Sequence, residues 1–500
     1  MNILLANLPW TVGGRSGVRA GSRWPHLKIA EEENYLPYPF FLGYATSLLK
    51  TNGFQARGLD AIAEGMSEDA FLDDAIKFKP ELVFAEVSTP SLAQDMRILR
   101  SVKGACKCMV AISGPDKNIE TASFLKENPH IDFVIPGEYE ETLLELAQAI
   151  KEKADLGAVD GLIFVKDNVP VKNKRRKLSS VDDAPWPDRE DFPIYKYHDC
   201  PGGIPEPSAQ VWASRGCPYR CMFCAWPQLM YSGNTYRPRD MALVAEEIEF
   251  LVRKKKFKSY YFDDDTFNIG KDRMEELARE LEIRNINVPW AFMGRADLAD
   301  KATLQAFRKV GLHAVKYGVE SSSQEILDRT TKGLDIKKAV EGILATKELG
   351  IKVHLTFTFG LPGETAKTID ETIKLALFLD PDSVQFSIAT PFPGTRFYDL
   401  AKSENMIVSE SWSDFDGNSR SVIKTGSLMP EDLEAAQKRA YEEWKDHRLH
   451  MKRYVKLSPV RLFTLCLKEH GLSYTMRKSV EYLRDRRFKH YFKQTKNSFF

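Results

Sequence analysis

Short apolar runs alternate with amphipathic segments along the first 150 residues of the chain. The short runs have the length and composition of buried strands, and the segments between them repeat apolar residues at helical spacing. The predicted strands cover residues 2–6, 54–59, 82–87, 108–113 and 133–135. The predicted helices cover residues 43–50, 68–78, 92–102, 119–126 and 140–151. This alternation predicts an α/β fold that begins with a doubly wound, Rossmann-like parallel sheet.

The segments that follow these predicted strands are rich in Gly, Ser and Pro. They cover residues 7–10, 88–90, 113–116 and 136–140. In a doubly wound sheet the ligand binds beyond the carboxyl ends of the strands, where Gly and Ser let it approach the backbone. Ordinary turns between strands and helices would explain the same composition, so the pattern alone leaves both readings open.

A boundary follows this first region. Residues 161–166 and 169–172 flank Asp167-Asn168 and predict a hairpin, after which prolines cluster between 184 and 207. The alternation then restarts, with strands predicted at 210–213, 259–262, 290–293, 314–319, 353–359 and 384–388. Because a full barrel needs eight such units, six units predict a partial (β/α)6 TIM-type barrel.

Four regions result from this reading. We predict a Rossmann-like domain at 1–155, a hairpin and Pro-rich linker at 156–208, a partial barrel at 209–400, and a basic helical C-terminal region at 401–500. The last region differs in charge, because residues 441–500 hold 15 Lys and Arg against 6 Asp and Glu. This basic, aromatic tail would suit a membrane surface, RNA or an anionic substrate. We expect instead a helical cap docked on the acidic body, with aromatics such as Tyr474, Tyr482 and Phe488 buried.

The overall composition excludes several classes of protein. Lys plus Arg number 71 and Asp plus Glu 70, which argues against a globally basic DNA-binding protein. No apolar run approaches the ~20 residues that span a bilayer. The first ten residues lack the basic region and cleavage site of a signal peptide, so we expect a cytoplasmic protein.

Three cysteines carry the clearest chemical signal. Cys217, Cys221 and Cys224 follow a Cys-x3-Cys-x2-Cys spacing directly after the first predicted barrel strand. Clustered thiolates suit an iron–sulfur cluster, and three ligands to a four-iron cluster leave one iron open. Zinc fits less well, because it usually takes a fourth ligand and the nearest histidine is His198.

This motif, with the aromatic Phe223 before its third cysteine, resembles the radical SAM superfamily. The segments after the later strands strengthen the resemblance; they are residues 260–267, 294–297, 317–321, 359–365 and 391–395. The parallel-sheet region in front, joined by a Pro-rich linker, is similar to the cobalamin-binding subclass. The resemblance covers roughly residues 1–400.

The resemblance implies a set of binding residues. Cys217, Cys221 and Cys224 would ligate a 4Fe–4S cluster, whose open iron S-adenosylmethionine would chelate. The residues expected to contact S-adenosylmethionine are Phe223, Asp264, Arg295, Glu320, Ser321, Gly360 and Pro362. Those expected to contact cobalamin are Leu8, Pro9, Ser88, Thr89, Ser113, Gly114, Gly137 and Glu138. Arg295 could instead only pair with Asp297, and Glu320 could be a satisfied carboxylate lining the barrel.

Two sequence details refine these expectations. Strand alternation makes Asp264 point away from Asp263 and Asp265, so a second metal at this triple carboxylate is not expected. The histidine motif that ligates cobalt in some cobalamin proteins is missing, because its nearest match, at 60–65, has Ile62 at the histidine position. We therefore expect no protein histidine on cobalt. Cys106 and Cys108 are expected to pack in the core.

The implied reaction is radical chemistry. A 5′-deoxyadenosyl radical would take hydrogen from an unactivated carbon of a small molecule, and methylcobalamin would then supply a methyl group. A one-electron reductant such as flavodoxin or ferredoxin is implied, and no catalytic side chain is assigned. A radical cyclase or oxidative rearrangement enzyme is the first alternative. A tRNA-modifying enzyme and a zinc-binding interaction protein are the others.

Overall fold

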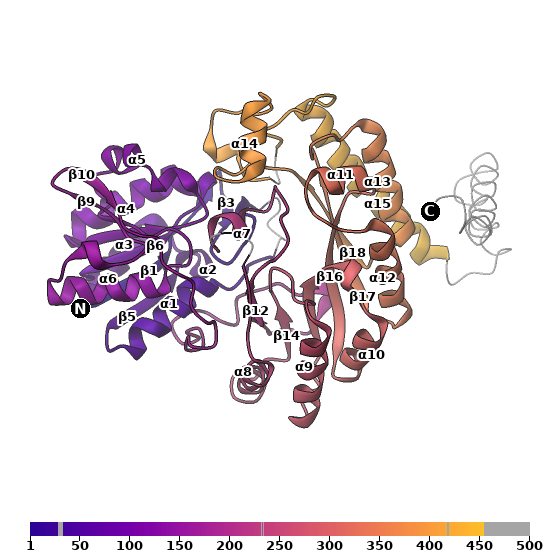
Figure 1. Cartoon of the computed structure of the whole chain (residues 1–500), viewed down its shortest axis with the longest axis horizontal. Helices are drawn as coiled ribbons and strands as arrows, with labels where there is room; N and C mark the ends of the chain where they lie inside the picture. Colours follow the sequence, from indigo (N-terminus) through magenta and orange to yellow (C-terminus); the bar gives the residue numbers. More distant parts are fainter. Residues whose placement is uncertain (29–33, 232, 234, 418–419, 455–500) are drawn as a thin grey trace.

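The computed structural model describes residues 1–454 except 29–33, 232, 234 and 418–419 (Figure 1). Its N-terminal part is built on a seven-stranded sheet in the order β10-β9-β8-β7-β6-β1-β5. The five parallel strands are β1 (Asn2–Asn7), β5 (Gln55–Asp60), β6 (Leu82–Glu86), β7 (Met109–Ser113) and β8 (Phe133–Val134). The predicted doubly wound parallel sheet is therefore confirmed.

The predicted hairpin belongs to this sheet and not to the linker. It consists of β9 (Ile163–Lys166) and β10 (Val169–Lys172), and β9 pairs antiparallel with β8. Pairing of this kind adds two strands at one edge of the sheet. The Pro-rich segment that links the two large sheets accordingly begins after residue 172.

Helices cover both faces of the N-terminal sheet because successive strand residues point to opposite sides. Ile3 and Leu5 face α1 (Phe40–Thr51) and α6 (Glu140–Glu152), which pack against each other. Leu4 and Ala6 face the opposite layer, which contains α3 (Glu68–Phe78) and α4 (Leu92–Cys106). Cys106 and Cys108 lie in this second layer, and Cys108 is buried there as expected.

The second large sheet has six parallel strands in sequential order. They are β11 (Ser208–Val211), β14 (Ser259–Phe262), β15 (Trp290–Gly294), β16 (Leu312–Glu320), β17 (Lys352–Phe359) and β18 (Ser383–Ile388). The helices that alternate with them are α8 (Met241–Arg253), α9 (Lys271–Ile283), α10 (Lys301–Lys309), α12 (Ile336–Glu348) and α13 (Ala366–Leu379). β11 and β18 form the two edges of the sheet, so the predicted partial barrel is confirmed.

The two sheets share one apolar core. The cluster that fills the α1/α6 face of the first sheet continues through buried aromatics into the barrel. Phe40 stacks on Trp212 with ring centroids 4.2 Å apart, and Phe41 lies 5.5 Å from Trp226. Buried aromatic rings contribute large apolar areas, so this junction stabilises both halves together.

Several short elements were not predicted. A small sheet after β1 contains β2 (Thr11–Val12), β3 (Arg15–Val18) and β4 (His26–Leu27). A second hairpin, β12 (Ser214–Gly216) with β13 (Tyr236–Pro238), encloses the cysteine loop and the short helix α7 (Ala225–Leu229). These strands are two to four residues long, which is too short for a periodic pattern.

The C-terminal region contains α14 (Arg396–Ser403) and α15 (Pro430–Tyr454). α15 packs on β18 and α13 at the barrel flank (Figure 1), with Leu433 and Ala440 fully buried. The described part of this region thus docks on the barrel as a cap, whereas most of the basic residues that led to this prediction lie beyond residue 454. Residues 455–500, with Cys466, Tyr474, Tyr482 and Phe488, lie outside the described residues. Among the described helices, none is long and apolar enough to cross a membrane.

Candidate active site

The cysteine loop lies between β12 and α7, at the carboxyl end of the barrel sheet. Cys217 is buried, Cys221 and Cys224 are half-buried, and all three carry free thiols. The Cys217 Sγ lies 3.3 Å from the Thr266 Oγ1. Three free, closely spaced thiols form a donor set that fits an iron–sulfur cluster.

Burial raises the pKa of all three thiols, and that of Cys217 rises to about 11. Thiolates are the form that binds metal, so a metal must displace the protons of these buried thiols. Assembly of a metal centre on this loop therefore depends on pH.

One side chain fixes the shape of the cysteine loop. The Gln228 Nε2 donates to the carbonyls of Cys221, Met222 and Cys224, at 3.4, 3.1 and 2.6 Å. From the barrel side, the Met222 N–H donates to the Thr330 carbonyl at 3.0 Å. The loop is thus held by one amide from α7 and by the segment that precedes Lys332.

The triple carboxylate has the predicted alternation. Asp263 and Asp265 both bind the guanidinium of Arg23, at 2.8 Å each. Asp264 points the other way and accepts hydrogen bonds from the Ala213 N–H and the Ser214 hydroxyl. Both Asp264 oxygens are engaged with the chain, which favours a structural role over the predicted contact with S-adenosylmethionine.

Arg295 forms an ion pair with Asp297, which was the alternative to a contact with S-adenosylmethionine. Its Nε and Nη2 donate to Asp297 at 3.0 and 2.7 Å, and the guanidinium stacks 3.7 Å from the Tyr219 ring centroid. It also donates to the carbonyls of Lys332 and Gly333, at 2.8 Å each. Arg295 therefore positions the turn that carries Lys332.

Glu320 ends β16 in a left-handed backbone conformation, with φ at +69°. Its carboxylate is buried and bonds to the Lys332 Nζ at 3.0 Å and the Thr358 Oγ1 at 2.8 Å. A strained non-glycine backbone at a strand end is typical of functional sites. The neighbouring Ser321 is fully buried, and its hydroxyl accepts from the Ser323 N–H.

Lys332 is the residue at this site that the sequence did not indicate. Its Nζ pairs with Glu320 and lies 6.0 Å from the Phe223 ring centroid, while its carbonyl accepts from Arg295. Three predicted contacts of S-adenosylmethionine therefore meet around one buried lysine. No local motif marks Lys332, which lies in a turn between two helices.

Gly360 and Pro362 lie after β17, in contact with the C-terminal region. Gly360 has φ at +86°, and a Cβ there would approach Leu433 to 3.2 Å and Ile423 to 3.4 Å. Pro362 is buried beside it. The space that the absent side chain leaves is thus taken by the cap, which differs from the predicted approach to an adenosyl group.

The predicted cobalamin residues divide into two groups. Leu8 and Pro9 follow β1, and Ser88 and Thr89 follow β6, the neighbouring strand where the strand order reverses. Ligands of doubly wound sheets bind at such switch points. All four are buried.

Further predicted cobalamin residues lie at the same edge, beside buried polar groups. Ser113 ends β7, Gly114 follows it, and Asp116 comes two residues later. Burial raises the pKa of Asp116, and hydrogen bonds from the Asn118 N–H and the Thr89 hydroxyl oppose this shift. These buried groups therefore partner each other at the ends of β6 and β7.

Gly137 and Glu138 belong instead to the contact between the two sheets. A Cβ at Gly137 would approach the Met230 carbonyl to 2.8 Å, and the Glu138 N–H donates to that carbonyl. The Glu138 carboxylate pairs with Arg215 and Arg237 of the β12–β13 hairpin. These contacts fix the hairpin that holds the cysteine loop.

A cavity of about 790 Å³ lies inside the barrel. Its wall includes Lys316, His354 and Gln385 from the first halves of β16, β17 and β18, with Arg23 and Tyr35 from the segment after β1. A cavity of this size holds a small molecule. Because its lining comes from segments far apart in sequence, no motif predicted it.

Comparison with known proteins identifies the family. The family model of the radical SAM superfamily matches residues 213–376, which contain the cysteine loop and strands β14 to β17. Residues 213–376 therefore form a radical SAM domain. Among the curated relatives of this chain is an uncharacterized methyltransferase of Pyrococcus horikoshii, 28% identical over 406 residues, which cover 81% of this chain and 86% of the relative.

Another relative is the anaerobic magnesium-protoporphyrin IX monomethyl ester cyclase of Rubrivivax gelatinosus. It is 30% identical over 363 residues, which cover 71% of this radical SAM chain and 64% of the cyclase. The match thus spans less than two thirds of the cyclase's own length.

Two solved structures share the fold of this radical SAM protein. The radical S-adenosylmethionine methyltransferase TsrM of Kitasatospora setae, with cobalamin and a 4Fe–4S cluster bound, superposes with a TM-score of 0.67 and 19% identity over 88% of this chain and 90% of TsrM. The cobalamin-dependent radical enzyme OxsB, with aqua-cobalamin and S-adenosylmethionine bound, superposes with a TM-score of 0.67. Its sequence identity is 14%, and the match covers 97% of this chain and 75% of OxsB. The arrangement of parallel-sheet region and partial barrel is therefore common to all three.

Proposed function

We propose that this protein is a cobalamin-dependent radical SAM methyltransferase that methylates an unactivated carbon of a small molecule. The observation that carries the proposal is the free cysteine loop, held between a partial barrel with a 790 Å³ cavity and a doubly wound sheet. TsrM and OxsB, which share this arrangement, bind cobalamin, and methyltransferases are among the relatives.

The residues of the chain have distinct tasks in this proposal. Cys217, Cys221 and Cys224 hold the 4Fe–4S cluster, and Phe223, Glu320 and Ser321 bind S-adenosylmethionine. When bound, the cluster and S-adenosylmethionine supply radical chemistry and cobalamin supplies a methyl carrier.

The surrounding side chains position these groups and exclude water. Lys332 neutralises the buried carboxylate of Glu320, and Arg295 holds the backbone of Lys332 in place. The residues after β1, β6 and β7 bind cobalamin at the edge of the sheet that meets the barrel. A largely buried, preorganised site of this kind protects a reactive radical from side reactions.

A radical cyclase is the second candidate. It is favoured by the 30% identity to the anaerobic cyclase of Rubrivivax gelatinosus, because the same cofactors would serve ring closure. The two functions differ in the fate of the methyl group: only the methyltransferase places a labelled methyl group of S-adenosylmethionine in the product.

We further propose a cytoplasmic location and a one-electron reductant such as flavodoxin or ferredoxin. Free thiols at all described cysteines are consistent with a reducing compartment. Reductive cleavage of S-adenosylmethionine consumes an electron, so an external one-electron donor must reduce the cluster.

Anaerobic reconstitution tests the proposal. We expect about four irons per chain, cleavage of S-adenosylmethionine on reduction, and uptake of one cobalamin. Changing Cys217, Cys221 and Cys224 together to Ala should remove iron and cleavage but leave cobalamin uptake, since the sheet is untouched. Cys106→Ala, which alters a half-buried thiol far from the loop, is the matched control. Full iron content in the triple variant, or no cobalamin in the wild type, would refute the assignment.

A further inference from the structure

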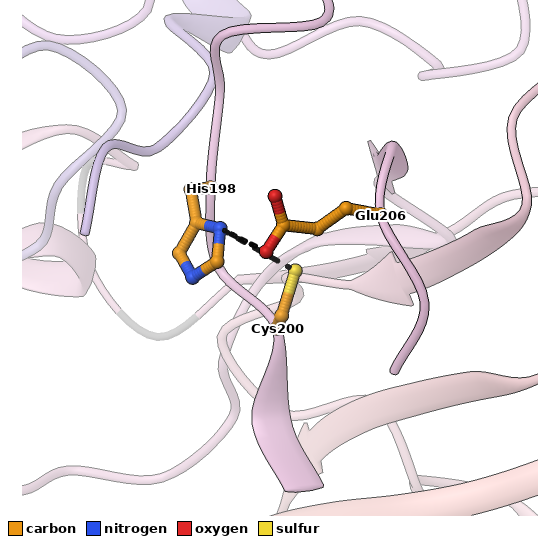
Figure 2. A group of neighbouring side chains, drawn as sticks. All are labelled: His198, Cys200 and Glu206. Atoms are coloured by element: carbon orange, nitrogen blue, oxygen red, sulfur yellow. Dashed lines mark hydrogen bonds and ion pairs between the residues drawn. The ribbon is translucent and has the colours of Figure 1, made fainter. Parts of the chain in front are cut away.

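A second group of metal-ligating side chains lies outside the cysteine loop. His198, Cys200 and Glu206 come from the segment that precedes β11, and their side chains converge on one point (Figure 2). One ligand atom from each lies within 4.8 Å of the others. The His198 Nδ1 is 3.2 Å from the Glu206 Oε1 and 3.8 Å from the Cys200 Sγ.

The two distances from the His198 Nδ1 are close to the edges of a zinc tetrahedron. Zinc binds histidine nitrogen and carboxylate oxygen at about 2.0–2.2 Å and thiolate sulfur at about 2.3 Å. At tetrahedral angles such bonds place N and O about 3.4 Å apart and N and S about 3.6 Å apart. The two distances from the His198 Nδ1 therefore differ from these values by only about 0.2 Å.

The backbone that carries these ligands is fixed by surrounding contacts. His198 and Leu36 exchange both of their backbone hydrogen bonds at 2.8 Å, and the Gly203 N–H donates to the Cys200 carbonyl at 3.0 Å. The Lys352 Nζ of the barrel donates to the Gly202 carbonyl at 2.8 Å. Because the loop is already ordered, metal binding would cost little conformational entropy.

The group also has a route from solvent and a neighbouring binding space. The Glu206 side chain is 65% exposed, so an ion can reach the site from outside. His198 and Cys200 line the 790 Å³ barrel cavity, whereas Glu206 lies outside its lining. Three protein ligands leave one zinc position for water or for an atom of a molecule in the cavity.

We propose that His198, Cys200 and Glu206 form a Zn²⁺ site at the wall of the barrel cavity. The ligand set of imidazole, thiolate and carboxylate suits zinc, and its two negative charges balance the ion. The site is separate from Cys217, Cys221 and Cys224 and does not depend on the radical reaction proposed above.

Zinc analysis of the cluster-loaded protein tests the site. We expect about one zinc per chain after Zn²⁺ addition and gel filtration, beside about four irons. X-ray absorption at the zinc edge, which does not detect iron or cobalt, should show one sulfur and lighter N/O ligands. Cys200→Ala and Glu206→Gln should each weaken zinc retention more than about tenfold. Cys106→Ala should leave it unchanged.

The readouts separate this site from its alternatives. Three sulfur ligands per zinc would place the ion on an unfilled cysteine loop and overturn the proposal. Loss of zinc from the wild type on gel filtration would show that His198, Cys200 and Glu206 do not hold the ion. They would then form only an ion pair beside a thiol. Glu206 is exposed, so Glu206→Gln should fold normally, and unchanged zinc content in that variant would exclude Glu206 as a ligand.

Discussion

Glu364, five residues beyond β17, is a carboxyl group with little support from its surroundings. The side chain is buried, and its Oε2 accepts a hydrogen bond from the Gly360 N–H. The Leu361 backbone adds a second hydrogen bond, but no cation among the described residues pairs with the carboxyl group. Burial therefore raises the pKa of Glu364 to about 8.

This shift predicts that folding stability decreases as the pH rises. The unfolded chain releases the Glu364 proton near its usual pKa, and the folded chain holds it until about pH 8. The stabilisation that this proton gives the folded chain is complete below the pKa of Glu364 in the unfolded chain. It is lost as the pH rises to 8. Glu364→Gln, which resembles the protonated form, should lack this loss. Between pH 5 and pH 8 the wild type should lose roughly 2–4 kcal/mol more than the variant.

Thermal or denaturant unfolding at both pH values measures the difference, because other titrating groups cancel between the two chains. Glu341→Gln, at an exposed position on α12, is the control and should follow the wild type. Parallel pH profiles for wild type and Glu364→Gln would contradict the buried, protonated state.

Individual residues differed in how far the sequence predicted them. The cysteines were predictable because their spacing is local and their chemistry is specific. Lys332 was not, since its partners Glu320, Phe223 and Arg295 come from three other segments. Asp264 shows the reverse: its direction followed from strand alternation, but its partners at 213 and 214 did not.

At the scale of elements, the cysteine loop owes its shape to the helix that follows it. α7 is five residues long and presents Gln228, whose Nε2 binds three loop carbonyls. Its Oε1 accepts from the Arg396 N–H at the start of α14 at 2.9 Å. Gln228 thus ties the loop to the C-terminal region.

We predict that Gln228→Met weakens retention of the cluster. The substitution keeps the side-chain volume but removes the donor to the Cys221, Met222 and Cys224 carbonyls. Each neutral hydrogen bond contributes about 0.5–1.5 kcal/mol, so loss of iron to a chelator should be at least several-fold faster. Gln148→Met, on the half-buried face of α6, should lose iron at the wild-type rate. Equal rates of iron loss for Gln228→Met and the wild type would show that other contacts determine the shape of the cysteine loop.

The strands of the two large sheets were predicted within about two residues, whereas helix ends were missed by up to four, as in α4 (Leu92–Cys106), predicted at 92–102. β14 was predicted with its observed bounds, and β18 (Ser383–Ile388) was predicted at 384–388. The hairpin of β12 and β13 was missed, because three residues per strand carry no periodicity and 19 residues separate the strands. Its pairing depends on contacts from Glu138, which the local sequence does not encode.

At the scale of the whole molecule, buried ion pairs join the two sheets. The Arg215 guanidinium lies 2.9 Å from Glu138 and 2.7 Å from Glu140, and Arg237 binds the other Glu138 oxygen. All of these side chains are buried or nearly so. Removal of one partner of such a network leaves an uncompensated charge, which is costly.

Arg215→Met should therefore destabilise the protein by roughly 3–5 kcal/mol. Glu140→Gln in the same chain should restore part of this loss by removing the charge left unpaired. Lys301→Met breaks the exposed pair with Glu348 and should cost about 0–1 kcal/mol. Denaturant unfolding of the wild type and these three variants measures the differences in stability. A similar loss of stability for Arg215→Met and Lys301→Met would show that the network contributes little.

The division into a parallel-sheet region and a partial barrel was predictable at this scale, and the contact between them was not. Arg23 reaches Asp263 and Asp265 across 240 residues or more, and Tyr38 donates its N–H to the side chain of Gln210. Such pairs form only when both halves have folded, so no window of sequence contains them.

The apolar core that runs from the α1/α6 face into the barrel has a consequence for how this chain can evolve. Many proteins exchange whole domains, because each domain fills its own interior and meets its neighbour through a thin polar surface. Here Phe40 and Phe41 complete the packing around Trp212 and Trp226. Recombination within the Pro-rich linker would combine an N-terminal part and a barrel whose core side chains do not pack against each other. Such lineages should therefore diversify by substitution inside the cavity and by change in the C-terminal region, and inherit the two halves as one unit.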